Sequence, residues 1–329
     1  HWWGDQCMDW PPLFEFLERH TLGTGGHRDA LTFVTVDPSA SSTCDWVTIE
    51  QQQQSLRPSR VDLVIERSGD DVLVKGSTKN VSHLSFDTSH PDLNANGTLL
   101  VDLDGCEPFT VMGETAYLAR GDDEGWASSG PIPANEKNPH RSGRLRSAWN
   151  HGVTLVVGTS GTPEETTWNS ARARQDAERW WYRGNGLVTI VNDVDFDPGA
   201  DPDRGLMLYG NQETNTAWEA MLGDSPIQVT RDSVLIGDRQ LDGSLAAAFV
   251  RPRPGSDVAS VGVVTGTSGE GERLAATMPL FFSGVGWPDW MIVEPVSLEN
   301  GEDGIVELGF FGRDFTLDPS QSAARENVR

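Results

Sequence analysis

Three glycine-containing segments in the second half of the chain carry hydroxyl and amide side chains directly after predicted strands. The candidate binding residues in them are Thr159, Ser160, Asn211 and Ser268. Open α/β sheets bind ligands at the carboxyl ends of their parallel strands, and backbone amides at a helix N-terminus attract anions. None of the segments has the pattern of a dinucleotide-binding loop or a P-loop, so tight turns that lead into capped helices are the competing interpretation. The segments are Gly158-Thr159-Ser160-Gly161-Thr162, Gly210-Asn211-Gln212-Glu213-Thr214-Asn215 and Gly266-Thr267-Ser268-Gly269-Glu270.

Ser160 is also a candidate nucleophile, because it lies where a predicted strand turns into a helix. A hydrolase elbow has the pattern G-x-S-x-G, and Thr162 stands in the place of its last glycine. A serine nucleophile needs a base and a group that orients that base. His151 lies near the start of the same predicted strand, and therefore at the wrong end of it. An independent esterase that uses Ser160 is kept as an alternative.

A run of acidic residues at alternate positions resembles a calcium loop. Asp193, Asp195 and Asp197 begin this run, and oxygen ligands suit a hard cation. The glycine falls one position late for an EF-hand, and the closing glutamate is missing. A solvated acidic loop is therefore the preferred interpretation, and the sequence predicts no metal or other cofactor.

Composition limits the classes of partner. The 329 residues include 49 acidic and 25 basic side chains, which gives a net charge of −24, and only three are lysines. Such a charge repels nucleic acid and anionic membranes, so neither is an expected partner. The excess of acid with few lysines favours a salt-adapted protein. No stretch approaches the roughly 20 apolar residues of a membrane helix, so we expect a soluble protein. The sequence leaves its location open and slightly favours an extracellular or periplasmic one, in a high-salt environment.

Hydrophobic patterning indicates the elements that position these residues. Residues 9–20 predict an amphipathic helix capped by Asp9. Alternating runs such as 61–66 predict short strands, and the continuous apolar run 153–157 predicts a buried parallel strand. Thr162, Pro163 and Glu165 then form a capping box that starts a helix. We therefore expect a multidomain α+β protein: a helical segment over 1–24, a β-sandwich over 25–120, a linker over 121–150, a three-layer α/β domain of Rossmann or flavodoxin type over 151–318, and a disordered tail over 319–329.

The predicted linker is basic, whereas the segments on either side of it are acidic. Residues 131–150 have a net charge of +3. We interpret residues 131–150, which we call the basic strap, as a contact between two acidic domains rather than as a ligand site. Its charged residues are Lys137, Arg141, Arg144 and Arg146, against Glu136.

Tryptophan and cysteine offer two weaker signals. Eight tryptophans could include a platform for sugar stacking, although core packing is the preferred interpretation for most of them. A carbohydrate-binding or structural module is therefore a second alternative function. The three cysteines, Cys7, Cys44 and Cys106, contain no CxxC pair and allow one disulfide at most. The tryptophans are Trp2, Trp3, Trp10, Trp46, Trp126, Trp149, Trp287 and Trp290.

The beginning of the chain is similar to the end of a known catalytic domain. Residues 1–17, His1-Trp2-Trp3-Gly4-Asp5-Gln6-Cys7-Met8-Asp9-Trp10-Pro11-Pro12-Leu13-Phe14-Glu15-Phe16-Leu17, resemble the end of an α/β-hydrolase domain of the prolyl-oligopeptidase and carboxylesterase type. There, the catalytic histidine follows the last strand and a final helix covers the sheet. The resemblance puts His1 in the general-base position. Later segments, among them Ser283-Gly284-Val285-Gly286-Trp287-Pro288-Asp289, look like the C-terminal extension of some large bacterial members.

The resemblance also implies what this chain lacks. In that fold the nucleophilic serine and the acidic member of the triad precede the histidine, so both would lie upstream of His1. The resemblance implies an accessory C-terminal portion of a serine hydrolase that cleaves esters or peptide-like bonds, and that is inactive alone. The expected partner is its own upstream hydrolase domain, and a homodimer is possible.

Overall fold

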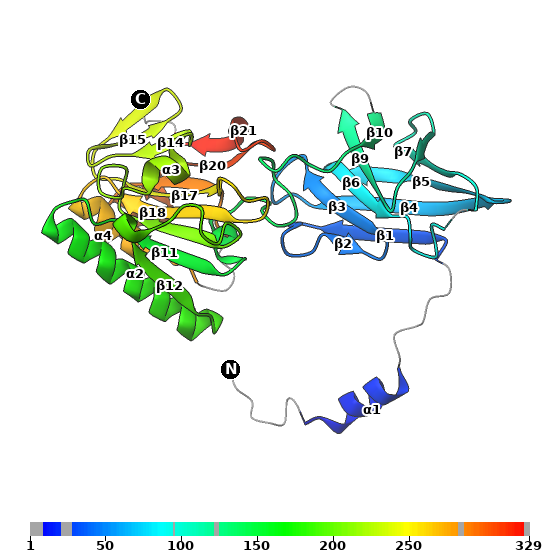
Figure 1. Cartoon of the computed structure of the whole chain (residues 1–329), viewed down its shortest axis with the longest axis horizontal. Helices are drawn as coiled ribbons and strands as arrows, with labels where there is room; N and C mark the ends of the chain where they lie inside the picture. Colours follow the sequence, from blue (N-terminus) through cyan, green and yellow to red (C-terminus); the bar gives the residue numbers. More distant parts are fainter. Residues whose placement is uncertain (1–8, 21–27, 95, 122–124, 282–285, 326–329) are drawn as a thin grey trace.

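The computed structural model describes residues 9–20, 28–94, 96–121, 125–281 and 286–325 (Figure 1). The chain is a mixed α and β protein in which sheet predominates, and its described strands form four sheets. Two of the sheets belong to the first part of the chain and two belong to the second. No helix of the described ranges is both long enough and apolar enough to span a membrane.

Helix α1 (Pro11–Arg19) lies apart from the sheets (Figure 1). It begins two residues later than expected, and its N-cap is Trp10, whose side chain makes no capping hydrogen bond. The expected cap Asp9 is therefore wrong, because the prolines that occupy the first turn set the start of the helix. None of its residues is buried, and Phe14, Phe16 and Leu17 are 47–56% exposed.

Two five-stranded sheets in the first part of the chain share one hydrophobic core. Alternate residues of their strands point into it, as the sequence pattern predicted; Val61 and Leu63 of one sheet and Ile49 of the other are fully buried. In order, the first sheet holds β1 (Ala30–Thr35), β4 (Ser59–Ser68), β5 (Asp71–Lys79), β7 (Leu99–Leu103) and β8 (Phe109–Val111). The second holds β10 (Gly125–Ser129), β9 (Thr115–Gly121), β6 (Val81–Asp87), β3 (Val47–Gln52) and β2 (Thr43–Cys44).

The predicted linker over 121–150 is shorter in the structure. Strand β10 lies inside it and pairs with β9, and Trp126 of β10 is buried in the core of the first part. At the other end, the 3-10 helix η2 (Leu145–Trp149) packs Leu145 and Trp149 into the core of the second part. The linker prediction failed at its first end because Gly121 and Gly125, at the ends of two paired strands, resemble the glycines of a flexible connection. It failed at the other end because the burial of Leu145 and Trp149 depends on residues distant in the sequence.

An eight-stranded mixed sheet forms the centre of the second part. Its first four strands are parallel, as the alternation of strands and helices predicted, and its last four are antiparallel to their neighbours, which the sequence did not indicate. The order is β12 (Val188–Asn192), β11 (Val153–Val157), β13 (Gly205–Tyr209), β18 (Ser260–Gly266), β17 (Ala246–Pro252), β19 (Trp290–Val293), β20 (Ile305–Phe311) and β21 (Leu317–Ala324).

Both faces of this sheet are covered. On one face lie α2 (Pro163–Gly184) and α4 (Gly269–Thr277), whose buried residues include Ala173 and Leu274 (Figure 1). On the other lie α3 (Trp218–Leu222) and a three-stranded sheet that the sequence did not predict. That sheet holds β14 (Ile227–Val229), β15 (Ser233–Ile236) and β16 (Arg239–Asp242). The short helices η3 (Asp193–Asp195), α5 (Ser297–Asn300) and η4 (Gly301–Gly304) complete the described elements.

The end of the chain differs from the expected disordered tail. Strand β21 continues to Ala324 and pairs with β20. Pro319 and alternating polar residues suggested a tail, but an edge strand tolerates both because one of its sides needs no ladder hydrogen bonds.

The basic strap connects the two parts, as its charge suggested. Lys137 donates hydrogen bonds to Ser55 of the first part and to Asp289 of the second. Arg144 forms an ion pair with Asp37 of the first part, while its backbone amide donates to Asp289.

Candidate functional site

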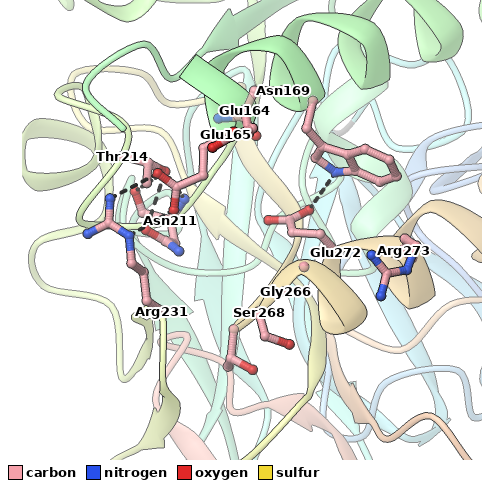
Figure 2. Close-up of a pocket in the computed structure, with 13 residues that line it drawn as sticks. Glu164, Glu165, Asn169, Asn211, Thr214, Arg231, Gly266, Ser268, Glu272 and Arg273 are labelled. Atoms are coloured by element: carbon pink, nitrogen blue, oxygen red, sulfur yellow. Dashed lines mark hydrogen bonds and ion pairs between the residues drawn. The ribbon is translucent and has the colours of Figure 1, made fainter. Parts of the chain in front are cut away.

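A cavity of about 400 Å³ opens at the carboxyl ends of β13 and β18 (Figure 2). It lies between the N-terminal ends of α2 and α4, where open sheets place their ligands. Two of the expected binding residues, Asn211 and Ser268, line it, whereas Thr159 and Ser160 do not. The other lining residues are Glu164, Glu165, Trp168, Asn169, Thr214, Arg231, Gly266, Thr267, Gly269, Glu272 and Arg273.

The capping box that starts α2 positions one wall of the cavity. Thr162 accepts a hydrogen bond from the backbone amide of Glu165, and the Glu165 carboxylate accepts one from the amide of Thr162. Both bonds were expected from the sequence, and they satisfy amides that a helix start leaves unpaired. The first two turns of α2 then direct Trp168 and Asn169 to the cavity.

Glycine is needed where two elements approach closely at the cavity. A Cβ atom on Gly266 would lie 2.2 Å from the backbone nitrogen of Glu272, so α4 can follow β18 only with glycine there. Gly210 has a φ of +96°, and a Cβ on it would lie 2.9 Å from Nδ2 of Asn169. These two glycines bring Glu272 and Asn169 to the ends of the strands.

Glu272 is a partly buried carboxyl group in the cavity wall whose pKa is raised. Its Oε1 accepts a hydrogen bond from Thr265 Oγ1 at 2.7 Å, and its Oε2 accepts one from Trp168 Nε1 at 3.2 Å (Figure 2). Burial raises the pKa of Glu272, although these donors and the charge of Arg172 act in the opposite direction. A carboxyl with such a pKa is a functional-site candidate, and here it also fixes the indole of Trp168.

Arg231 closes the cavity on the opposite side. Its guanidinium binds both oxygens of Glu165 at 2.8 and 3.1 Å, and it lies 3.4 Å from Glu213. This bidentate pairing is the main reason why the pKa of Glu165 is lowered to about 2. The positive charge of Arg231 is therefore already balanced within the wall.

We expect the Glu165→Gln variant to be less stable than the wild type at neutral pH, but equally stable at pH 2. The unfolded pKa of Glu165 is near 4.5 and the folded one is about 2, so the charged pair stabilises the protein fully above pH 4.5. That contribution declines as the pH falls towards 2. The glutamine still accepts the capping hydrogen bond. Urea unfolding should show a loss of at most about 1 kcal/mol at pH 7, because both side chains are partly exposed, and none at pH 2.

Glu164→Gln is the matched control, since Glu164 is exposed and forms no ion pair with a described residue. Its stability difference should stay near zero at every pH. A pH-independent loss in Glu165→Gln would contradict the pairing with Arg231.

Two amide side chains at the cavity are buried and only partly satisfied. Asn169 is 4% exposed; its Nδ2 donates to the Gly158 carbonyl, while its Oδ1 accepts no hydrogen bond from a described residue. Asn211 is 5% exposed; its Oδ1 accepts from the amide of Glu213, while its Nδ2 has no acceptor among the described residues. The cavity thus presents one free acceptor and one free donor.

Ser160 lies outside this cavity and beside a carboxylate. Its Oγ is 3.5 Å from Asp193 Oδ2, and its amide donates to the Thr214 carbonyl. Thr159 and Thr216 also donate to Asp193, and their hydrogen bonds lower its pKa against the effect of burial. Among the described residues, no histidine contacts Ser160. A carboxylate with a lowered pKa is a poor base, so the nucleophile hypothesis gains no support here.

The calcium alternative has no structural support in the described ranges. Asp193 uses its carboxylate to fix two neighbouring loops, and Asp197 accepts a hydrogen bond from the amide of Gly199. The described part of the chain contains no group of three or more potential metal ligands. The alternate spacing of the aspartates reflects an ordered turn, because Asp side chains readily bond to nearby backbone amides.

The remaining sequence candidates fall into three groups. His1, Trp2, Trp3 and Cys7 lie outside the described residues, so the general-base assignment is not tested. Cys44 and Cys106 are free thiols. Of the six proposed platform tryptophans that the structure describes, five are buried in cores and Trp10 is largely exposed. The five are Trp46, Trp126, Trp149, Trp287 and Trp290.

Sequence reasoning missed most of the cavity. It considered the loops after the strands, but Trp168 and Glu272 come from the first turns of the helices that follow. Arg231 comes from a turn of the unpredicted small sheet. One available signal was the position of Trp168 near the start of a helix whose other aromatic residues, Trp180, Trp181 and Tyr182, lie at its far end.

Comparison with known proteins assigns no family. No family model matches the chain, and no curated protein matches it.

Proposed function

We propose that this chain is the C-terminal accessory portion of a serine hydrolase, and that its cavity binds a ligand rather than reacting with it. The observation that carries the first statement is the apolar face of α1, which no other described element covers. This face is formed by Leu13, Phe14, Phe16 and Leu17, with the N-cap residue Trp10 beside it. A helix with one apolar face gains its stability by burying that face against another element. This segment resembles the final helix of an α/β-hydrolase domain, which covers the sheet of that domain. We therefore infer that the sheet of an upstream hydrolase domain buries the apolar face of α1.

The distribution of polar groups supports the second statement. Catalysis by a serine hydrolase needs a nucleophile, a base and an orienting group in contact. Ser160 has only Asp193 beside it, and Ser268 is occupied as the cap of α4, where it accepts from Gly271 and donates to Ser244. The cavity holds free amide groups instead, which is the chemistry of recognition.

The finer fold assignments belong to the same proposal. The shared core of the first two sheets supports a β-sandwich, and the helices on one face of the mixed sheet, with α3 and the small sheet on the other, support a three-layer domain of Rossmann or flavodoxin type. In this view both units shape substrate access or docking for the upstream catalytic domain. The net charge of −24 supports adaptation to high salt.

We expect the chain as given to be inert towards a fluorophosphonate probe. The folded protein, incubated with the probe in molar NaCl, should show no adduct by intact-mass spectrometry, because no described serine forms a hydrogen bond to a described histidine that could act as its base. Ester hydrolysis should be the same in the wild type and in Ser160→Ala. A single adduct that disappears in Ser160→Ala would overturn the accessory proposal and favour the independent esterase. A serine esterase that reacts with fluorophosphonates serves as the positive control for the probe.

A further inference from the structure

A second cavity, of about 420 Å³, lies at the opposite end of β17 and β18 from the candidate site. The candidate site includes Gly266, where β18 ends, whereas the second cavity includes Pro252, where β17 ends beside the start of β18. Three of the side chains that line the second cavity are arginines: Arg141 of the basic strap, Arg251 of β17 and Arg253 directly after β17. We call it the arginine cavity.

Two of these arginines are buried without a carboxylate partner. Four cationic side chains are buried in the described part of the chain. Lys137 and Arg172 each form an ion pair with an aspartate, at 2.7 and 3.0 Å. Arg141 and Arg253 are each 1% exposed, line the arginine cavity and form no ion pair with a described residue. A buried charge is costly unless it is paired, so the arginine cavity is where direct partners for buried cations are missing.

Backbone carbonyls hold the two buried guanidinium groups in place. Nη1 of Arg141 donates to two carbonyls of the segment 256–259, at 2.7 and 3.0 Å. Both Nη atoms of Arg253 donate to carbonyls of the segment 198–204. Nε of Arg141, Arg251 and Arg253 is buried and has no hydrogen-bond partner among the described residues. Carbonyls carry no net charge, so these bonds fix the guanidinium groups without supplying a counter-ion.

Arg251 is the arginine of this cavity that can pair with a ligand. It is only partly buried, and its one hydrogen bond to a described residue goes from Nη1 to the Phe315 carbonyl. Its guanidinium carbon lies 5.0 Å from the ring centroid of Phe311, a cation–π contact that orients the group. Nη2 of Arg251 has no described acceptor and is not among the buried unpaired atoms, so it is open to a ligand. An oriented guanidinium with free N–H groups is the side chain that binds carboxylates and phosphates best.

Three aspartates also line the arginine cavity, but none of them pairs with its arginines. Asp224, Asp257 and Asp314 are exposed, and the Asp314 carboxylate accepts from the amide and the hydroxyl of Thr316. Burial lowers the pKa of Arg251, and the charges of Asp224 and Asp314 act in the opposite direction. These aspartates repel anions, and they repel a doubly charged phosphate more strongly than a carboxylate with its single charge. The cavity therefore favours a carboxylate.

We propose that the arginine cavity binds the carboxylate group of a small organic ligand, which pairs with Arg251 and is stabilised by the charges of Arg141 and Arg253. A carboxylate supplies the acceptor atoms and the negative charge that the described residues do not offer to these arginines. Pro252 and Pro254 also line the cavity, so the ligand needs an apolar body beside its charged group. The volume of about 420 Å³ falls within the range of small-molecule sites, roughly 300–1,000 Å³. This inference goes beyond the proposed function and requires no upstream domain.

The test is a ligand-observed NMR titration of the chain as given, with benzoate as the probe. Benzamide has nearly the same shape without the charge, and inorganic phosphate and sulfate represent the competing anions. The titration uses the lowest NaCl concentration at which circular dichroism shows a folded chain, because molar salt screens exposed charges. We expect benzoate to bind with a Kd of about 1 mM, since a small ligand in an open site binds weakly. Benzamide should bind at least about tenfold more weakly, because it cannot form a charged pair with Arg251.

Three variants locate the binding. Arg251→Gln removes the pairing charge and should weaken benzoate binding about tenfold. Asp257→Asn removes one repelling charge and should tighten benzoate binding about twofold. The Asp257 carboxylate is exposed and forms no hydrogen bond with a described residue, so we expect this variant to fold. The control is Arg273→Gln: Arg273 is exposed and lines the cavity of the candidate site instead, so benzoate should bind this variant like the wild type.

Absence of benzoate binding to the folded protein would overturn the inference. So would equal binding of benzoate and benzamide, tighter binding of phosphate or sulfate than of benzoate, or benzoate binding that Arg273→Gln weakens and Arg251→Gln does not. If Arg251→Gln does not fold, Asp257→Asn decides, and unchanged or weaker benzoate binding to that variant would contradict the proposal. These results are independent of the fluorophosphonate experiment, which reports on serines and on the accessory role.

Discussion

Replacing Lys137 by methionine should lower the free energy of unfolding by about 3–5 kcal/mol. Lys137 is 6% exposed, and its three N–H groups donate to Ser55, Asp289 and the Phe311 carbonyl at 2.7–2.8 Å. Asp289 is fully buried. The methionine keeps the shape of the side chain but removes the ion-pair partner of the Asp289 carboxylate, and breaking a buried ion pair on one side is strongly destabilising.

Urea unfolding, followed by tryptophan fluorescence and by circular dichroism, would measure this loss. Because Lys137 joins the two parts of the chain, we also expect the two parts to unfold more independently in the variant, with transitions that no longer coincide between the probes. The double variant Lys137→Met with Asp289→Asn should lose less than the sum of the single variants, since it removes both charges.

The matched control is Lys75→Met. Lys75 forms an ion pair with Glu66 at 3.0 Å, but the two side chains are 41% and 55% exposed. Solvent screens such a pair, so the loss should be below about 1 kcal/mol. Equal losses in Lys137→Met and Lys75→Met would show that the buried network does not hold the parts together.

The contact between Lys137 and Asp289 shows which features of the fold could be predicted from the sequence and which could not. The basic character of residues 131–150 between acidic segments indicated that the strap joins two parts of the chain. The sequence did not indicate that Lys137 is the buried member, because burial depends on Asp289 and Phe311, which lie more than 150 positions away. Local patterns reveal charge and periodicity, whereas partners distant in the chain follow from the tertiary structure.

The candidate site shows the same division. Asn211 and Ser268 were predicted from a general rule about strand ends, and the capping box from a four-residue pattern. Trp168 and Glu272 were missed, because their meeting depends on where α2 and α4 lie on the sheet rather than on any local motif. The calcium alternative, which rested on the spacing of the aspartates from Asp193 onward and was not the preferred interpretation, found no support in the described residues.

Replacing Arg172 by methionine should lower the free energy of unfolding by roughly 3–5 kcal/mol, as Lys137→Met does. Arg172 and Asp176 lie on the buried face of α2, and the Arg172 Nε donates to Asp176 Oδ2 at 3.0 Å. The Tyr209 hydroxyl, on β13, donates to the same oxygen at 3.1 Å. Burial, together with the charge of Asp176, raises the pKa of Tyr209 well above its usual value, so the tyrosine stays a donor.

The substitution would leave Asp176 buried with one neutral donor and with the more distant Arg179, which lies 3.7 Å from its Oδ1. It would also raise the pKa of Glu272 further, because the charge of Arg172 lowers it. Thermal or urea unfolding measures the first effect. Adding Asp176→Asn to the variant should recover part of the loss, since an amide of the same size accepts the tyrosine hydroxyl without an unpaired charge.

The control variant Arg174→Met shows whether the loss of stability in Arg172→Met comes from the buried ion pair or from a change in helix propensity. Arg174 lies two positions along the same helix but is exposed, so the same chemical change there should alter the stability by no more than about 0.5 kcal/mol. If both variants lost the same amount, helix propensity would explain the result, and the buried pair would have no special role. A large loss for Arg172→Met alone would mean that a charged network fixes α2 on the sheet, and with it the positions of Trp168 and Asn169 at the cavity.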